Sequence, residues 1–343
     1  MIPGGAINRP LLIENEVLSM RAAPSTTPRQ VVSRQARADS VLMGRHDYFS
    51  VVLRLIGMEL YKIRRRAMSK VLSVIGIITV IGLFAIFTVV AWQTQNDTSS
   101  LAQSISEPLR LPFTFYFIAE VLLLLGEVLI VILAAVVVGG EYGAGTVRLM
   151  YTRGPSRTQL FLGKIGAILV CIMLGVIGLT VVGIISGGLL NLTTGYTQDF
   201  SFFNLIWLGQ TLLYLLIIAL GLFIYAMMAL SISTLGRASA AGITAVLVWS
   251  FVIEQVVATV LAELGNAIGG ALGKFFEALP DYTIGKNISS LLATQATGVL
   301  GPAGPILYSQ EESTLHALLV LAVYLALFVG LAWWVVLRRD VTN

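Results

Sequence analysis

Charged side chains gather in one short segment of this sequence, residues 139–164, which lies between two long apolar runs. The segment holds one acid and four bases: Glu141, Arg148, Arg153, Arg157 and Lys164. Several glycines and one proline interrupt it, whereas the runs on either side are almost purely apolar. We interpret the segment as a surface on which a soluble partner pushes.

Three further acids lie inside the apolar runs: Glu120 and Glu127 in the second run, and Glu254 in the fifth. An ionisable group costs roughly 2.5–3.5 kcal/mol at the centre of a membrane helix, so such residues usually face the bundle interior or a wet cavity. Glu120 and Glu127 are seven residues apart, which places them on one helical face. They can form a polar stripe along a transport path, or stay neutral and hydrogen-bond to a neighbouring helix. For Glu254, beside Gln255, the second role is favoured.

Patterns that would indicate catalysis are missing from the sequence. It contains no GxxxxGK[ST] phosphate loop, and no Cys/His cluster has the spacing of a metal site. The single cysteine, Cys171, cannot form a disulfide within the chain. We therefore expect this chain to be no enzyme and to hold no cofactor or metal.

The composition of the chain is that of a membrane protein. It is 57% hydrophobic and 12% charged, whereas a soluble domain carries about 25% charged residues. Apolar segments without proline recur along it, each long enough to cross a roughly 30 Å hydrocarbon core. Because backbone polar groups in lipid must be satisfied within the segment, we predict an all-α integral membrane fold. The six predicted spans are about residues 71–92, 114–138, 161–189, 207–232, 240–262 and 315–337.

Basic residues predict the orientation of these spans. With the N-terminus in the cytoplasm, nineteen of the 22 Lys and Arg fall inside, and only Arg110, Lys274 and Lys286 fall outside. Such a bias follows the positive-inside rule. We expect a multi-pass protein of a bacterial plasma membrane with both termini cytoplasmic. The excess of basic residues then serves to orient the spans in the membrane, and no nucleic acid partner is expected.

Two regions flank the predicted bundle. Residues 1–45, with scattered prolines and arginines, are predicted to be a mobile cytoplasmic tail before a six-span domain at 46–343. Residues 47–67 are amphipathic at helical spacing, which predicts a helix in the headgroup plane with a basic, lipid-contacting face. That face holds Arg54, Lys62, Arg65 and Arg66. A charge cluster that only sets topology is the alternative. Between spans five and six, residues 263–314 are predicted to form short outer helices.

Segment 139–164 also carries an ordered signature. Reading along the chain, it contains a Glu, a Gly-Thr pair, a Pro-Ser-Arg turn and a Lys, at Glu141, Gly145, Thr146, Pro155, Ser156, Arg157 and Lys164. This order resembles the signature of ABC-2 type transporter permeases, the membrane subunits of one class of ATP-binding-cassette exporters. The resemblance extends over about residues 46–343, with the amphipathic helix, the six spans and the enlarged loop before the last span. The tail is longer than that family usually carries.

The resemblance implies a mechanism that needs partners. A cytosolic ABC ATPase in two copies would carry the ATP and Mg, and a second permease, the same or a similar chain, would complete the complex. A cytoplasmic coupling helix between spans two and three, which Thr146 can begin and Gly154-Pro155 ends, would sit in a groove of the ATPase with the amphipathic helix. The coupling residues would be Glu141, Gly145, Thr146, Arg148, Arg153, Pro155, Arg157 and Lys164. The implied function is export of an amphipathic or drug-like substrate across the plasma membrane.

Two other functions remain open. The chain could be a force-transmitting or regulatory ABC membrane subunit that moves no solute. It could also be a secondary transporter, for which broken helices at corresponding places in two repeated halves would be evidence. The sequence shows no such repeat. Segment 139–164 itself could be an ordinary basic inner loop that only fixes topology.

Overall fold

The computed structural model describes residues 47–94, 111–143, 156–194, 202–301 and 312–338. Within these ranges the chain is helical and has no β-strand. It divides into two units, residues 1–50 and 51–343. All contacts described below lie within the second unit.

Six helices of the described chain are long and apolar enough to cross a membrane, which confirms a multi-pass membrane protein. Four of them are single helices: α3 (Ala67–Gln93), α8 (Arg157–Thr194), α9 (Leu205–Gly236) and α15 (Thr314–Arg338). The second span consists of α5 (Thr114–Val121), a π-helical turn η2 (Leu122–Gly126) and α6 (Glu127–Gly143). The fifth consists of α10 (Ser239–Val248), the π-helical turns η3 (Trp249–Ile253) and η4 (Val256–Leu261), and α11 (Ala262–Ile268).

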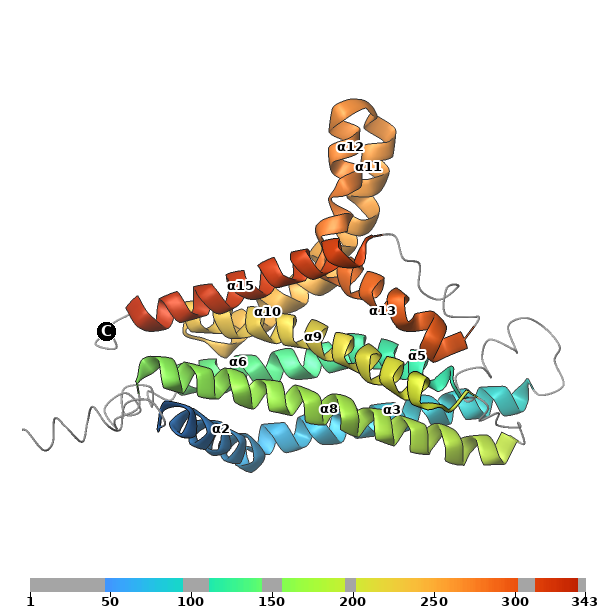
Figure 1. The fold of residues 1–343 in the computed structure, drawn as a ribbon, viewed down its shortest axis with the longest axis horizontal. Helices are drawn as coiled ribbons and strands as arrows, with labels where there is room; N and C mark the ends of the chain where they lie inside the picture. The colour runs from blue at the N-terminus through green and yellow to red at the C-terminus, as the bar shows by residue number, and fades with distance from the viewer. Residues whose placement is uncertain (1–46, 95–110, 144–155, 195–201, 302–311, 339–343) are drawn as a thin grey trace, which may run out of the picture. The chain divides into compact units, whose positions relative to one another are not determined.

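Helix α9 lies at the centre of the packing. Inside its most apolar stretch 72% of the residues are buried, against 12% in the fifth span and 22% in the sixth. It contacts α6, α8, α10, α13 and α15, which surround it (Figure 1). Apolar residues occupy its whole circumference, and a helix of that kind can be enclosed on every side.

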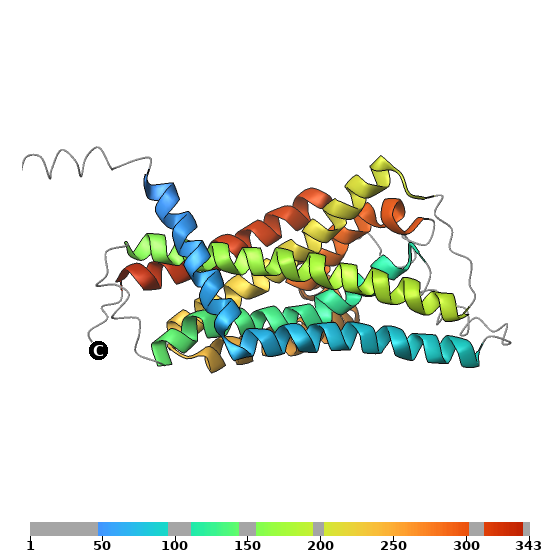
Figure 2. The same ribbon diagram turned by 90° about the horizontal axis from the view of Figure 1, so that it is seen from below.

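Helix α2 (Asp47–Arg65) precedes the first span and, from Val51 on, crosses α8 obliquely (Figure 2). Its buried residues, Val52, Leu55, Glu59 and Ile63, repeat every three or four positions. The two helices approach closely at Gly163 of α8, where an added Cβ would lie 2.9 Å from Leu55 Cβ. Extended backbone at Arg66 then separates α2 from α3. The amphipathic pattern thus gives a helix here, but its buried face includes an acid, Glu59.

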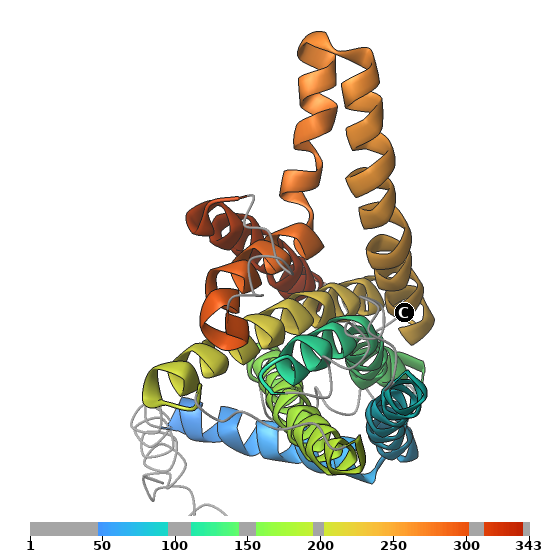
Figure 3. The same cartoon turned by 90° about the vertical axis from the view of Figure 1, so that its right-hand side faces the viewer.

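Short helices fill the described part of the segment between the fifth and sixth spans. Helices α11 and α12 (Gly270–Ala278) pack against each other as an antiparallel hairpin, which stands apart from α9 in two views (Figures 1 and 3). A 3-10 turn, η5 (Pro280–Tyr282), then leads to α13 (Ile284–Leu300), which packs on α9 and α15. The presence of short helices agrees with the sequence, while their location outside the membrane stays a prediction.

Candidate functional site

Four charged side chains from three helices meet in one ion cluster, which consists of Glu59 and Lys62 of α2, Glu141 of α6 and Lys164 of α8. Lys164 Nζ lies 2.6 Å from Glu141 Oε2 and 3.3 Å from Glu59 Oε1. Lys62 Nζ lies 2.8 Å from Glu59 Oε1 and 3.1 Å from Glu141 Oε1. Each base therefore contacts both acids. The two positive and two negative charges balance, which is the condition under which charged groups can be buried.

Because its side chains are buried, the ion cluster holds its three helices together strongly. The side chains of Glu59, Glu141 and Lys164 are only 3%, 7% and 12% exposed, and Lys62 is 30% exposed. Burial by itself lowers the pKa of Lys62, but the hydrogen bond to Glu59 and the charges of Glu141 and Glu59 outweigh it and raise the pKa above the ordinary lysine value. Lys62 is thus charged at neutral pH. Removing one partner of such a buried set leaves an uncompensated charge, so α2, α6 and α8 are held together at this point.

Two arginines at helix ends bind backbone carbonyls. Arg66 Nη1 donates to the carbonyl of Val136 in α6 over 3.1 Å. Arg157 Nη1 donates to the carbonyls of Leu337 and Val336, 3.2 and 3.4 Å away, in the last turn of α15. At α15 the contact is of the kind in which a cation at the C-terminus of a helix stabilises it through the unpaired carbonyls and the helix dipole, whereas Val136 lies within α6. These contacts link α15 to α8, and α6 to the junction of α2 and α3.

Helix α8 begins four residues earlier than the predicted third span. Ser156 and Gln159 form a reciprocal capping box: the Gln159 amide donates to Ser156 Oγ over 3.2 Å, and the Ser156 amide donates to Gln159 Oε1 over 3.0 Å. Arg157 is therefore the first residue of α8. Serine followed three residues later by glutamine is a helix-start signal in the sequence, and it lies just before the predicted span.

The structure places only some of the residues predicted for coupling. Glu141 and Lys164 come together in the ion cluster, and Arg157 contacts α15. The others lie outside the described residues: Gly145, Thr146, Arg148, Arg153 and Pro155. The predicted coupling helix falls mainly in residues 144–155, so it too lies outside them.

The residues predicted to contact lipid divide into two groups. Arg54 and Arg65 are exposed, and their contact with lipid stays a prediction. Lys62 and Arg66 also contact protein, at the ion cluster and at the Val136 carbonyl, and their contact with lipid stays a prediction as well. Sequence reasoning missed Glu59, although its spacing of three residues from Lys62 on a helix is a recognised ion-pair signal.

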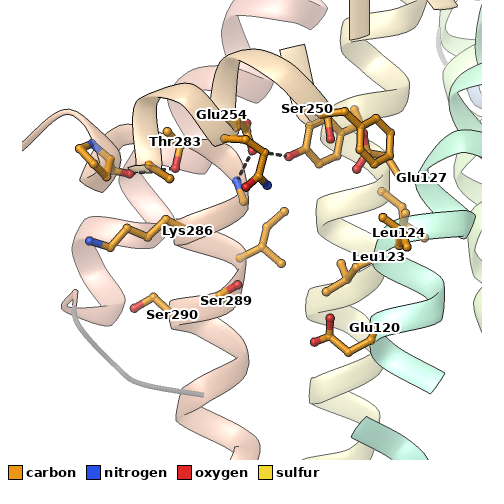
Figure 4. Close-up of a pocket in the computed structure, with 18 residues that line it drawn as sticks. Glu120, Leu123, Leu124, Glu127, Ser250, Glu254, Thr283, Lys286, Ser289 and Ser290 are labelled. Atoms are coloured by element: carbon orange, nitrogen blue, oxygen red, sulfur yellow. Dashed lines mark hydrogen bonds between the residues drawn. The ribbon is translucent and has the colours of Figure 1, made fainter. Parts of the chain in front are cut away.

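A second site lies within the bundle. A cavity of about 570 Å³ is bounded by spans two and five, α9 and α13, and Glu120, Glu127 and Glu254 all line it (Figure 4). Glu127 directly follows the π-helical turn η2, and Glu254 directly follows η3. Such wide turns change the direction in which the following side chains point and recur at functional sites. The structure therefore brings the three predicted membrane acids to one cavity.

Glu254 is held by four donors. Its carboxylate accepts from Tyr225 Oη at 3.0 Å and Trp249 Nε1 at 2.8 Å. It also accepts from the backbone amides of Ile284 at 3.2 Å and Gly285 at 3.1 Å. These amides belong to the first turn of α13, where backbone donors have no partner within the helix. The bonds give Glu254 a packing role that fixes α13 against spans four and five.

Glu127 differs from Glu254 in its surroundings. Its side chain is buried, with 5% of its surface exposed, and it lines the cavity together with Ser250. Its Oε1 atom has no hydrogen-bond partner within the described chain. In those same residues no group of three or more His, Cys, Asp or Glu side chains could hold a metal ion.

Comparison with known proteins identifies a family that the chain matches. The model of a family described as "Protein of unknown function (DUF2705)" matches residues 86–342, which is most of the chain. The match begins within the first span and covers the cavity together with Glu141 and Lys164. No curated protein matches the chain.

Proposed function

The chain belongs to the DUF2705 family, and we propose that it is the membrane subunit of an ATP-driven exporter of the ABC-2 type. In this proposal a separate cytosolic ATPase, present in two copies, binds ATP and Mg. A second permease completes the complex. The complex moves an amphipathic substrate across the plasma membrane.

The ion cluster is the observation that carries this proposal. Segment 144–155 joins the end of α6 to the beginning of α8, and the cluster ties those two ends to α2. A push on the segment by a soluble partner would therefore act on three helices as one body. Such a rigid junction suits the transmission of a stroke, whereas a loop that only fixes topology needs no buried ion pairs.

Helix α6 connects the ion cluster with the cavity. Glu141 lies in its last turn and Glu127 is its first residue, fourteen positions away. At about 1.5 Å per residue the two carboxyl groups are separated by about 21 Å along the axis. A movement imposed at Glu141 would thus reach the cavity wall at Glu127. This connection favours solute movement over a subunit that transmits force without a substrate.

One observation favours a secondary transporter as a second candidate. The π-helical turns η2 and η3 occupy the second and fifth spans, which correspond to each other if the six spans form two halves of three. Each turn is directly followed by a glutamate of the cavity. A secondary transporter would work without an ATPase, so the two candidates differ in their partners.

The experiment is purification of the affinity-tagged full chain from its native membranes in mild detergent. The exporter proposal expects a stoichiometric second chain that carries a phosphate loop and hydrolyses ATP, with two copies per complex in native mass spectrometry. A complex that contains only this chain and shows no ATP hydrolysis would support the secondary transporter instead. An ATPase that binds without any stimulation by solutes would indicate force transmission.

A further inference from the structure

The cavity is lined by more acidic than basic side chains. Glu120, Glu127 and Glu254 line it, and Lys286 is the one base among its lining residues. Lys286 Nζ lies 2.8 Å from Asp281 Oδ1, so its charge is already compensated. The lining is acidic overall, and a positively charged ligand would improve its electrostatic balance.

Glu127 is the acid best placed to receive such a ligand. It is 95% buried by side-chain packing and lines the cavity, and its Oε1 lacks a hydrogen-bond partner within the described residues. A buried acceptor left unpaired costs free energy, so the carboxyl group gains from a donor that enters the cavity beside it. Glu254, by contrast, already accepts four hydrogen bonds. Its role is to position α13, which forms the opposite wall.

The size and the walls of the cavity define the rest of the ligand. Leu123, Leu124, Leu222, Phe251 and Ile288 supply apolar surface between the polar groups. The volume of about 570 Å³ lies within the range of roughly 300–1,000 Å³ of sites for drug-sized molecules. A bare metal ion would need several converging ligands, and the described residues offer no such group. The site therefore suits an organic cation with an apolar body.

We propose that this cavity binds an amphipathic organic cation whose protonated amine donates a hydrogen bond to the Glu127 carboxyl group while its apolar part packs on the leucines and Phe251. The ligand is the exported solute, an identification that rests on the proposed function. Binding itself requires neither ATP nor a partner chain.

The test uses the purified full chain in lipid nanodiscs with two fluorescent probes. Dansylcadaverine carries an apolar ring system and a primary ammonium group, and its N-acetyl derivative has the same skeleton without the charge. Dansyl fluorescence rises in apolar surroundings, so titration gives a Kd for each probe. A charge-assisted hydrogen bond of about 1.5–3 kcal/mol corresponds to about tenfold to a hundredfold tighter binding of the amine.

Matched variants locate the site. Glu127→Gln keeps the size of the side chain and removes the charge, and should weaken dansylcadaverine binding to the level of the acetylated probe. Glu277→Gln makes the same chemical change at an exposed position of α12 away from the cavity, and should leave Kd unchanged. The preference of the unaltered chain for the amine needs no variant, so it tests the proposal even where Glu127→Gln reduces the yield of folded protein.

The outcomes separate this inference from the proposed function. Equal affinity for both probes in the unaltered chain, or unchanged amine affinity in folded Glu127→Gln protein, would overturn the cation site and leave the ATPase partnership standing. Selective binding of the amine that depends on Glu127, in a chain that co-purifies with no ATPase, would support the site and refute the exporter.

Discussion

Glu141→Gln should destabilise the protein far more than an equivalent change at an exposed ion pair. The carboxylate of Glu141 is 7% exposed and contacts Lys164 at 2.6 Å and Lys62 at 3.1 Å. Breaking a fully buried ion pair costs about 3–5 kcal/mol. Both lysines keep Glu59, at 3.3 and 2.8 Å, and Lys62 retains some water. We therefore expect the low end of that range, about 3 kcal/mol of unfolding free energy.

Asp281→Asn is the matched control for this prediction. It makes the same acid-to-amide change in the pair with Lys286, where both side chains are 27% exposed. Exposed pairs contribute about 0–1 kcal/mol. Equilibrium unfolding in mixed micelles, followed by tryptophan fluorescence, measures both variants. A loss in Glu141→Gln no larger than in Asp281→Asn would refute the reasoning.

Charge inversion tests whether the four groups act together. Exchanging only Glu141 and Lys164 restores their own pair, but it places two ammonium groups at positions 62 and 141 and two carboxylates at positions 59 and 164. That exchange should remain destabilised. Inverting all four charges restores opposite charge at every contact and should recover most of the stability. Recovery by the twofold exchange alone would show that Glu141 and Lys164 form an independent pair.

Three more predictions follow from the packing and the charge pattern. Gly163→Ala should lower the free energy of unfolding by about 1–3 kcal/mol, because its Cβ would lie 2.9 Å from Leu55 Cβ. Gly57→Ala is the control, because open space surrounds Gly57, and it should not destabilise the protein. Equal losses of unfolding free energy in the two variants would contradict this. Glu254→Leu leaves two amides of α13 unpaired, so hydrogen exchange of Ile284 and Gly285 should accelerate, whereas unchanged protection would show that another group caps α13. In a Cys171→Ser background, Phe275→Cys should react with an impermeant thiol reagent in intact cells, and Arg237→Cys should react only after permeabilisation. Labelling of Arg237→Cys from outside would overturn the predicted orientation.

The membrane helices could be predicted from the sequence because hydrophobic length is a local property. All six predicted segments lie within described helices that could cross a membrane. The observed helix ends differ from the predicted bounds where the ends are polar. At Ser156 and Arg157, for example, the capping box and the contact with α15 extend α8. The π-helical turn at Leu122–Gly126 lies in a run of leucines, which gives no sign of where a helix widens.

The site was harder to predict because its contacts join distant parts of the chain. The type and spacing of Glu141 and Lys164 marked them as important, but their partners on α2 depend on how that helix crosses α8. The same holds for Glu254, whose four donors come from α9, η3 and α13. The three membrane acids were recognised by their cost in lipid, while only the packing of spans two and five places them in one cavity.

ATP turnover by the purified complex decides whether this chain works as proposed. Arg148 and Arg153, both changed to Glu, reverse the charge of the segment that we expect the ATPase to contact. Arg29 and Arg34, both changed to Glu in the predicted tail, make an equal change in net charge as the control. We predict that the first variant inserts and folds but loses bound ATPase and solute-stimulated hydrolysis, while the control keeps both. Equal ATPase binding and hydrolysis in the two variants would contradict coupling through residues 144–155.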